Sequence, residues 1–201
     1  MSPRKINKEE KRREIALASC DLIYEVGMKK LTVAEVARTA GIGKGTIYEY
    51  FENKEDIIFE IINMHIEQHH KEFTEKVSKL NTIEEKLELF FDFLLNDTEE
   101  NMKHFNGYKE FLSIVLAEEN LPMKEFNCEK NEYFGGELIK ILEDSINKGE
   151  IKKEAINLSN GILTYQKGLA IRKMSQANFD VRTDYESFIG TILQLIEIKN
   201  D

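Results

Sequence analysis

The sequence predicts an all-helical protein with a small N-terminal three-helix head and a larger helical body. Its 201 residues include only two prolines and eleven glycines, whereas an all-β fold needs a turn roughly every 8 to 12 residues. Apolar residues recur at intervals of three and four, the period of an amphipathic helix. Several periodic segments follow the pattern Thr-x-x-Glu, which allows a capping box at a helix start.

The first two helices are expected from periodicity and capping. Residues 7–26 carry one apolar stripe, and Gly27 follows as a helix end. Thr32 and Glu35 have the capping-box spacing, so we expect a second helix to begin at Val33.

Later helices are marked in the same way. Capping pairs are Asn53 with Asp56, Thr82 with Glu85, and Thr183 with Glu186. The expected helices span residues 54–80, 83–96, 99–118, 123–148, 154–177 and 184–199. Because glycine weakens a helix, we expect a break or bend at Gly107 and an interruption at Gly135 and Gly136, while Pro122 separates the two helices concerned.

The composition favours a cytoplasmic protein with no membrane segment. Hydrophobic residues make up 41% and charged residues 32%, and no apolar run approaches the ~20 residues that cross a bilayer. The basic, polar N-terminus does not resemble a secretory signal. Cys20 and Cys128 have no metal-binding spacing.

Charge is distributed unevenly along the chain. Residues 1–54 contain eleven Lys or Arg and eight Asp or Glu, a balance of +3. Because the whole chain has a net charge of −9, the remaining residues carry −12. The first thirteen residues alone have a balance of +4, to which Arg4 and Lys5 contribute. This head could be an electrostatic footprint for phosphates, or a solvated tail on an acidic protein.

Residues 33–51 have the pattern of a helix-turn-helix, in which two short helices cross at a tight turn. Ala37 is small where the helices approach closely, and Gly41 allows the positive φ that ends the first helix. The expected apolar anchors are Ile42, Ile47 and Phe51.

The outward face of the second short helix has hydroxyl and cationic groups. Its residues are Lys44, Thr46, Tyr48, Glu49 and Tyr50. Hydroxyls can donate to phosphates or base edges, and lysine displaces counterions, so this face suits DNA. The alternative is that the tyrosines pack the small domain and the lysines are ordinary surface residues.

One string of residues in the head is distinctive. It comprises Gly27, Leu31-Thr32-Val33, Val36-Ala37, Ala40-Gly41-Ile42, the run from Gly43 to Phe51, and Asn53-Lys54-Glu55. With these residues the region 12–56 resembles the DNA-binding head of the TetR family of bacterial transcriptional regulators. The body resembles the family only weakly, at Gly149-Glu150-Ile151 and Gly168-Leu169.

The resemblance implies roles for residues of the head. Phosphate contacts are implied for Thr32, Lys44, Tyr50 and Lys54, and an approach to bases for Gly45, Thr46, Tyr48 and Glu49. Gly43 replaces the serine usual at the second helix's N-cap, and Glu49 stands where histidine is frequent. Glu49 could accept a hydrogen bond from cytosine or point away from the phosphates.

Histidines and aromatic residues of the body allow several interpretations. His65 and His69 are one helical turn apart, a spacing that can bind a metal, but no third ligand is evident. We therefore predict no metal, and consider His69 a cavity residue or an ordinary core or surface histidine. Aromatic clusters favour a lipophilic or aromatic effector, as the resemblance implies, or simply form the core. The effector-binding candidates are His69, Phe90, Phe93, Phe105, Tyr108, Phe111, Tyr133, Phe134 and Tyr165.

The last two expected helices carry more apolar residues than they can bury alone, which predicts a homodimer. A symmetric dimer presents two recognition helices to half-sites ~34 Å apart or somewhat more.

Together these features predict a ligand-responsive repressor with a DNA-binding domain at residues 1–52 and an effector-binding and dimerisation domain at 53–201. Its expected partners are double-stranded DNA, a small-molecule effector and a second copy of the chain. The alternative is a helical protein-interaction module in which DNA binding is secondary. We recognise no nucleophile motif, phosphate loop or metal set, so no catalytic residue or cofactor is expected.

Overall fold

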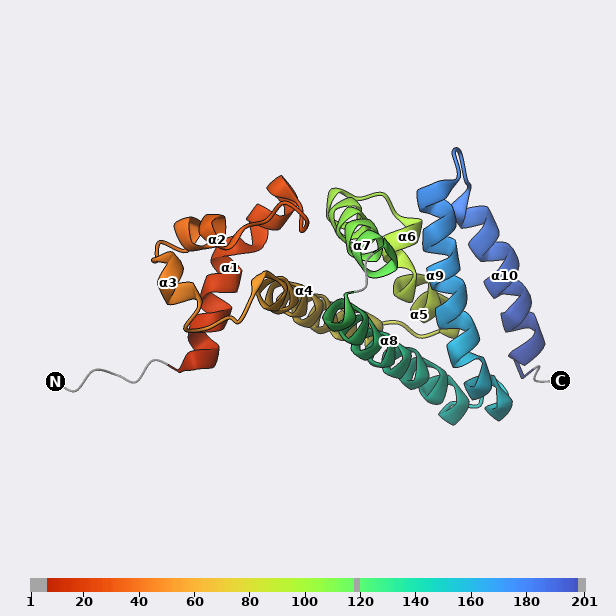
Figure 1. Cartoon of the computed structure of the whole chain (residues 1–201). Coiled ribbons are helices and arrows are strands. Elements are labelled where there is room, and N and C mark those ends of the chain that lie inside the picture. Colours follow the sequence, from red (N-terminus) through yellow and green to blue (C-terminus); the bar gives the residue numbers. More distant parts are fainter. Residues whose placement is uncertain (1–6, 118–119, 199–201) are drawn as a thin grey trace. The chain divides into compact units, whose positions relative to one another are not determined.

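The computed structural model describes residues 7–117 and 120–198, except the side chain of Ala117. Every α-helix named below is shown in Figure 1. The helices are α1 (Lys8–Val26), α2 (Val33–Thr39), α3 (Lys44–Ile47), α4 (Lys54–Val77), α5 (Ile83–Phe90), α6 (Asp92–Leu95), α7 (Glu99–Ala117), α8 (Leu121–Asn147), α9 (Ser159–Ser175) and α10 (Val181–Ile196). A 3₁₀ helix, Lys153–Leu158, precedes α9. The all-helical fold class is confirmed.

The chain forms two compact units. Unit 1 contains the described residues up to Thr74 together with Glu110–Phe126, and unit 2 contains Glu75–Lys109 together with the described residues from Asn127 onward. Unit 1 therefore includes most of α4, and α7 and α8 each contribute residues to both units. The division into functional domains at residues 52 and 53 stays a prediction.

Unit 1 is built around the inner face of α1. Ile15 and Ala16 are fully enclosed, and they share the core with Val36 of α2 and Ile47 of α3. Phe51, which follows α3, closes this core and is also buried. Helix α3 has only four residues, too few to be stable in isolation, so its conformation depends on this packing.

Three helix starts follow the capping chemistry that the sequence indicates. Thr32 and Thr82 each form a complete capping box, with Glu35 and Glu85 respectively. Asn53 Oδ1 accepts the Asp56 N–H at 2.8 Å at the start of α4. The predicted capping boxes at Thr32 and Thr82 and the cap at Asn53 are confirmed.

The predicted cap at Thr183 is wrong. Helix α10 begins at Val181, and its N-cap is Asp180, whose carboxylate accepts the Thr183 N–H at 3.0 Å and the Thr183 hydroxyl at 2.7 Å. Thr183 therefore occupies the third position inside the helix. An aspartate three residues earlier offers the same oxygen acceptor, so it takes the cap first.

The predicted breaks at glycines are also wrong. Helix α7 continues through Gly107, and α8 continues through Gly135 and Gly136. Glycine costs a helix only about 1 kcal/mol relative to alanine, which tertiary packing can offset. Pro122 lies in the first turn of α8, where its missing N–H removes no helical hydrogen bond.

Several predicted boundaries require correction. The helix expected over 54–80 ends at Val77, its buried residues include Ile57 and Ile61, and His69 is exposed. The segment 83–96 divides at the buried Phe91, and the first turns of segment 154–177 are 3₁₀. Local pattern alone does not set these boundaries, because tertiary packing overrides helix propensity.

Unit 2 has its own core, in which Phe91 contacts the ring of Tyr185 at a centroid distance of 5.0 Å. At the end of α5, the Phe90 carbonyl accepts from the buried Gln166 amide of α9 at 2.8 Å. Buried Lys86 of α5 pairs with Asp144 of α8. Among the described residues, no helix is long and apolar enough to cross a membrane.

The two threonines test the corrected capping scheme. We expect Thr82→Ala to lower the free energy of unfolding by about 1 kcal/mol, because it removes an N-cap acceptor. Thr183→Ala removes no cap and should change stability by less than about 0.5 kcal/mol. Urea unfolding followed by circular dichroism measures both, and equal losses in the two variants would contradict the assignment.

Candidate nucleic-acid interface and effector region

The turn between α2 and α3 has the geometry that the helix-turn-helix pattern predicts. Helix α2 ends at Thr39, and Gly41 then adopts a φ of +67°, a conformation that favours glycine. The chain returns toward α2, and the Ile42 N–H donates to the Ala37 carbonyl at 3.0 Å. The N-cap of α3 is Gly43, which provides no side-chain cap. The predicted helix-turn-helix at residues 33–51 is confirmed.

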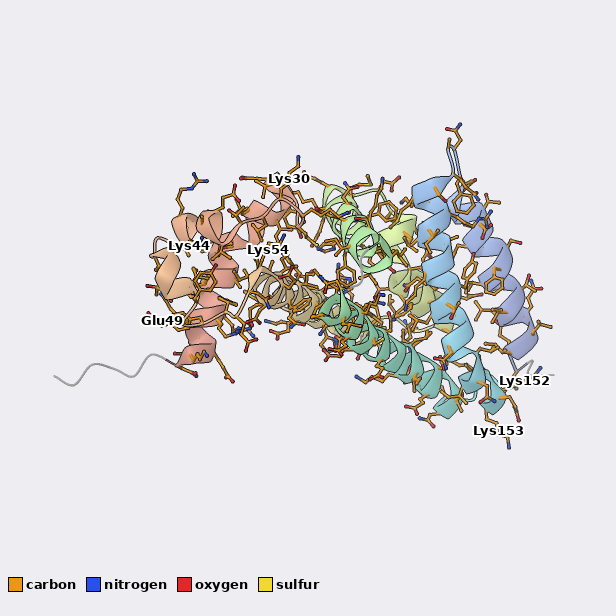
Figure 2. The ribbon with its side chains drawn as sticks, viewed as in Figure 1. Lys30, Lys44, Glu49, Lys54, Lys152 and Lys153 are labelled. Atoms are coloured by element: carbon orange, nitrogen blue, oxygen red, sulfur yellow. The ribbon has the colours of Figure 1, made fainter. Side chains whose placement is uncertain are left out.

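The outer face of α3 is open. Lys44, Gly45 and Glu49 are exposed, and the Tyr48 side chain is 53% exposed, while Thr46 and Tyr50 are half-buried. Figure 2 labels Lys44, at the start of this short helix, and Glu49, in the turn that follows it. A Cβ added at Gly45 would meet nothing within 4 Å, so the backbone itself is accessible there. The face thus presents hydroxyl groups, one cation and one carboxylate around the exposed backbone at Gly45.

Two of the residues that the resemblance implies as phosphate contacts form hydrogen bonds within the protein. The exposed Thr32 hydroxyl donates to Glu35 Oε2 at 2.7 Å as part of its capping box. Lys54 Nζ donates to the carbonyl oxygens of Lys29, at 3.1 Å, and Met28, at 3.4 Å. Lys54 therefore supports the turn between α1 and α2.

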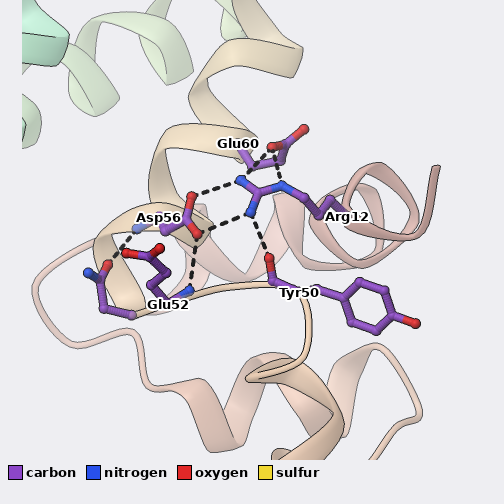
Figure 3. Close-up of polar contacts among 6 residues, drawn as sticks. Arg12, Tyr50, Glu52, Asp56 and Glu60 are labelled. Atoms are coloured by element: carbon purple, nitrogen blue, oxygen red, sulfur yellow. Dashed lines mark hydrogen bonds and ion pairs between the residues drawn. The ribbon is translucent and has the colours of Figure 1, made fainter. Parts of the chain in front are cut away.

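Arg12 joins three segments of unit 1, and the sequence did not indicate this role. Its guanidinium donates to Asp56 Oδ1 at 2.7 Å, to Glu60 Oε2 at 2.9 Å and to the Tyr50 carbonyl at 2.7 Å (Figure 3). It also lies 4.5 Å from the centre of the Phe51 ring. We call Arg12, Asp56, Glu60 and the Tyr50 carbonyl the Arg12 clamp.

Opposite charges stabilise the Arg12 clamp. The hydrogen bond from Arg12 holds the pKa of Asp56 below its ordinary value, although partial burial opposes this shift. The same hydrogen bond raises the pKa of Arg12. The cation is therefore held by α4 and by the end of the helix-turn-helix.

The basic N-terminus contributes less free charge than its sequence suggests. Arg12 belongs to the clamp, Arg13 pairs with Glu67 at 2.7 Å, and Lys11 pairs with Glu14 at 2.8 Å. The interpretation of this segment as a phosphate footprint therefore needs correction at these positions. Arg4 and Lys5 lie outside the described residues.

The predicted effector residues are distributed over both units. In unit 2, Phe93 meets Tyr108 edge-on at 6.2 Å, and Tyr133 meets Phe134 at 5.2 Å. Burial raises the pKa of Tyr108, and burial together with Glu137 raises that of Tyr133 to about 12.

The other candidates have different surroundings. Phe90 packs against Phe91, and Phe105 lies beneath the Lys173 ammonium. Tyr165 stacks on Phe188 of α10 at 4.0 Å and donates to Asp184, so it lies between the last two helices. In unit 1, Phe111 contacts Phe126 and the exposed His69 stacks on Phe73.

The last two helices expose large apolar side chains. Exposed residues are Ile171 on α9 and Phe188 and Leu195 on α10, the last with 67% of its surface accessible. Among residues 7–117 and 120–198, no group of three or more His, Cys, Asp or Glu side chains is arranged to hold a metal ion.

Comparison with known proteins identifies similar regulators. Residues 15–61 match the family model described as bacterial regulatory proteins, tetR family. The chain is 29% identical over 185 residues to the fatty acid metabolism regulator protein of Bacillus subtilis, covering 92% of this chain and 81% of the relative. It is 26% identical over 153 residues to the regulator QacR of Staphylococcus aureus, covering 72% and 80%.

Solved structures agree in fold. The regulator FadR from Bacillus subtilis, solved in complex with stearoyl-CoA, aligns with a TM-score of 0.61 and 25% identity over 90% of this chain and 95% of that one. A TetR-family regulator from Cytophaga hutchinsonii aligns with a TM-score of 0.75 and 18% identity, covering 98% of this chain and 100% of that one. At that identity the second likeness supports the fold alone.

The Arg12 clamp predicts a pH-dependent contribution to stability. Because the folded-state pKa of Asp56 is lowered, its stabilisation is complete above about pH 4 and is lost as pH falls through the lowered pKa. We expect Arg12→Met to cost about 2 kcal/mol at neutral pH, since it leaves two partly buried carboxylates unpaired. The difference from wild type should shrink below about pH 3.

Urea unfolding at a series of pH values measures this difference. Arg13→Met is the matched control, because it removes a more exposed ion pair on the same helix and should cost less than about 0.5 kcal/mol. A loss for Arg12→Met that is independent of pH would show that packing, rather than the ion pair, accounts for the effect.

Proposed function

We propose that this chain, which belongs to the TetR family of bacterial transcriptional regulators, is a homodimeric repressor that binds a palindromic operator and is released by a long-chain acyl ligand. The observation that carries the DNA-binding part is the open face of α3, on which Thr46, Tyr48 and Lys44 surround the accessible backbone at Gly45. Its relatives are regulators of transcription.

The face of α3 fits the major groove through its chemistry. In the proposed complex, Tyr48 and Thr46 approach base edges, and Lys44 and Tyr50 contact phosphates. Gly45 lets the helix come close to the DNA because no side chain intervenes. Glu49 is exposed in the turn that follows α3, where its carboxylate can accept from a cytosine amino group.

Thr32 and Lys54 have a further role in this proposal. Their side chains already hold the start of α2 and the turn before it. Both acceptors of these Lys54 hydrogen bonds are neutral carbonyl groups. Both residues therefore support the DNA-binding conformation while lying next to the phosphate backbone.

Dimerisation through α9 and α10 accounts for their exposed apolar side chains. Ile171, Phe188 and Leu195 would be buried between two copies of the chain, which favours association. A twofold axis between the copies gives two heads and hence an operator with inverted half-sites.

The effector is proposed from the chemistry of unit 2 and from the relatives. The pairs Phe93 with Tyr108 and Tyr133 with Phe134 offer aromatic surface on α6, α7 and α8. Such surface suits an extended hydrocarbon chain. The regulator of fatty acid metabolism and the stearoyl-CoA complex among the relatives indicate an acyl-CoA.

Release of DNA then requires only a modest coupling free energy between effector binding and operator binding. If acyl-CoA favours a conformation of the body in which α4 is displaced, the two heads lose the spacing that the operator demands. A coupling free energy of ~1 to 3 kcal/mol changes operator affinity by roughly 5- to 150-fold.

The DNA interface is tested by selecting bound fragments from a random DNA pool. We expect an inverted repeat, and we expect the double variant Thr46→Ala, Tyr48→Ala to bind the selected site about 100-fold more weakly, since each base contact contributes ~1 to 3 kcal/mol. Binding that is unaffected by the double variant would favour a protein-interaction module.

Two separate lysine variants provide the electrostatic control for this experiment. Lys44→Ala should reduce the slope of log affinity against log salt by about 1, because it removes one phosphate contact. Lys153, on the 3₁₀ helix of unit 2 (Figure 2), is also exposed. Lys153→Ala should leave the slope unchanged, and equal effects would indicate nonspecific attraction.

The effector class is tested by adding stearoyl-CoA to the operator complex. Operator affinity should fall at least about fivefold, and free coenzyme A should have no effect because it lacks the acyl chain. Phe93→Ala should raise the stearoyl-CoA concentration that is needed for release, by about tenfold for the loss of one aromatic contact. Release by free coenzyme A as well would contradict a site for the acyl chain.

A further inference from the structure

The turn between α1 and α2 is held by two helices outside the helix-turn-helix. Its backbone N–H at Lys29 donates to Glu110 Oε1 of α7 at 3.2 Å. Its carbonyl at Lys29 accepts from Lys54 Nζ of α4 at 3.1 Å. All of these residues lie in unit 1. The N–H of Lys29 is thus bound by α7, and the carbonyl of Lys29 is bound by α4.

Glu110 also packs directly on the backbone of the turn. Gly27, which ends α1, has a φ of +82°, and a Cβ added there would lie 2.7 Å from Glu110 Oε1. No side chain fits that space without displacing the carboxylate. The absence of a side chain at residue 27 therefore permits the close approach of Glu110, in addition to permitting the positive φ.

The turn leads straight into the helix-turn-helix. Leu31 is buried, and its N–H donates to the Gly27 carbonyl at 3.0 Å. Thr32, the next residue, is the N-cap of α2. A displacement of the turn would therefore move the start of α2.

The part of α7 that holds the turn is itself firmly packed. Phe111, next to Glu110, meets Phe126 of α8 edge-on at 6.0 Å, and Phe126 stacks on Phe59 of α4 at 4.7 Å. On the other side of Glu110 in the sequence, the same continuous helix carries Tyr108, a proposed effector residue. Glu110 thus stands on α7 between an effector candidate and this aromatic packing.

We propose that Glu110 is a positioning residue for the DNA-binding head, which transmits a displacement of α7 to the start of α2 through the Lys29 amide and the backbone of Gly27. This route is distinct from a displacement of α4, because it acts on the turn through a different helix. The proposal rests on the proposed function, since it assigns a role in effector-controlled DNA binding.

Three variants separate transmission from simple structural support. Glu110→Ala removes the acceptor of the Lys29 N–H. Glu110→Gln retains an oxygen acceptor at the same position. Glu100→Ala removes an exposed carboxylate from the same helix and controls for the loss of one negative charge.

The main measurement is operator affinity with and without stearoyl-CoA. For Glu110→Ala we expect about tenfold weaker binding in the absence of ligand, as for the loss of one hydrogen bond to a charged group. We also expect the ratio of the affinities without and with ligand to fall to less than about twofold, compared with at least about fivefold in wild type. Glu110→Gln and Glu100→Ala should keep the wild-type ratio.

A second measurement does not depend on the effector. Hydrogen exchange at the Lys29 amide should be at least about tenfold faster in Glu110→Ala than in wild type or Glu110→Gln, because its acceptor is gone. Thermal unfolding of each variant verifies that the chain remains folded.

The outcomes distinguish this proposal from the proposed function. Weaker operator binding by Glu110→Ala with an unchanged affinity ratio would overturn transmission, because a purely structural role weakens both states equally. If stearoyl-CoA does not release wild-type protein, the proposed effector is wrong, and the role of Glu110 is decided without ligand. Wild-type operator affinity or wild-type Lys29 exchange in Glu110→Ala would then overturn it.

Discussion

The DNA-binding head depends on one cluster of partly buried ion pairs, the Arg12 clamp. Helices α2 and α3 have seven and four residues, and helices this short gain little from their own hydrogen bonds. Their arrangement must come from contacts with longer elements. Arg12 provides such contacts by joining α1 to the carboxylates of α4 and to the carbonyl at the end of the helix-turn-helix.

The two sides of the short helices have different roles. The inner side of the helix-turn-helix packs Val36, Ala37 and Ile47 into the core of unit 1. The outer side of α3 does not pack into this core and remains exposed. The turn before α2 is held separately, by Lys54 from α4 and Glu110 from α7. The main chain of this turn is therefore held by side chains from two different helices.

Local chemistry made much of this fold predictable from the sequence. The capping boxes at Thr32 and Thr82 and the positive φ of Gly41 follow from residues within a few positions of each other. Where two local patterns competed, as at Asp180 and Thr183, the sequence indicated the wrong cap. Continuity of α7 and α8 through their glycines depends on tertiary packing, which a one-dimensional pattern does not contain.

The candidate site was predictable in part for the same reason. The exposed face of α3 follows from helical period and from the position of Gly41. Arg12, however, appeared as one more basic residue in a charged tail, because its partners Asp56 and Glu60 lie more than forty residues away. Glu110 is eighty-one residues from Lys29 and carries no local pattern at all. Pairings at such separations become visible only when the chain is folded.

The contact of Arg12 with position 50 has an evolutionary consequence, because it is made to the main-chain oxygen rather than to the tyrosine ring. Every amino acid offers that oxygen. The side chain at position 50 on the proposed DNA-binding face can therefore change while the scaffold that presents it stays unchanged. Descendants of such a gene could acquire new target sequences by a few substitutions on one surface, without a new fold or a new anchoring arginine.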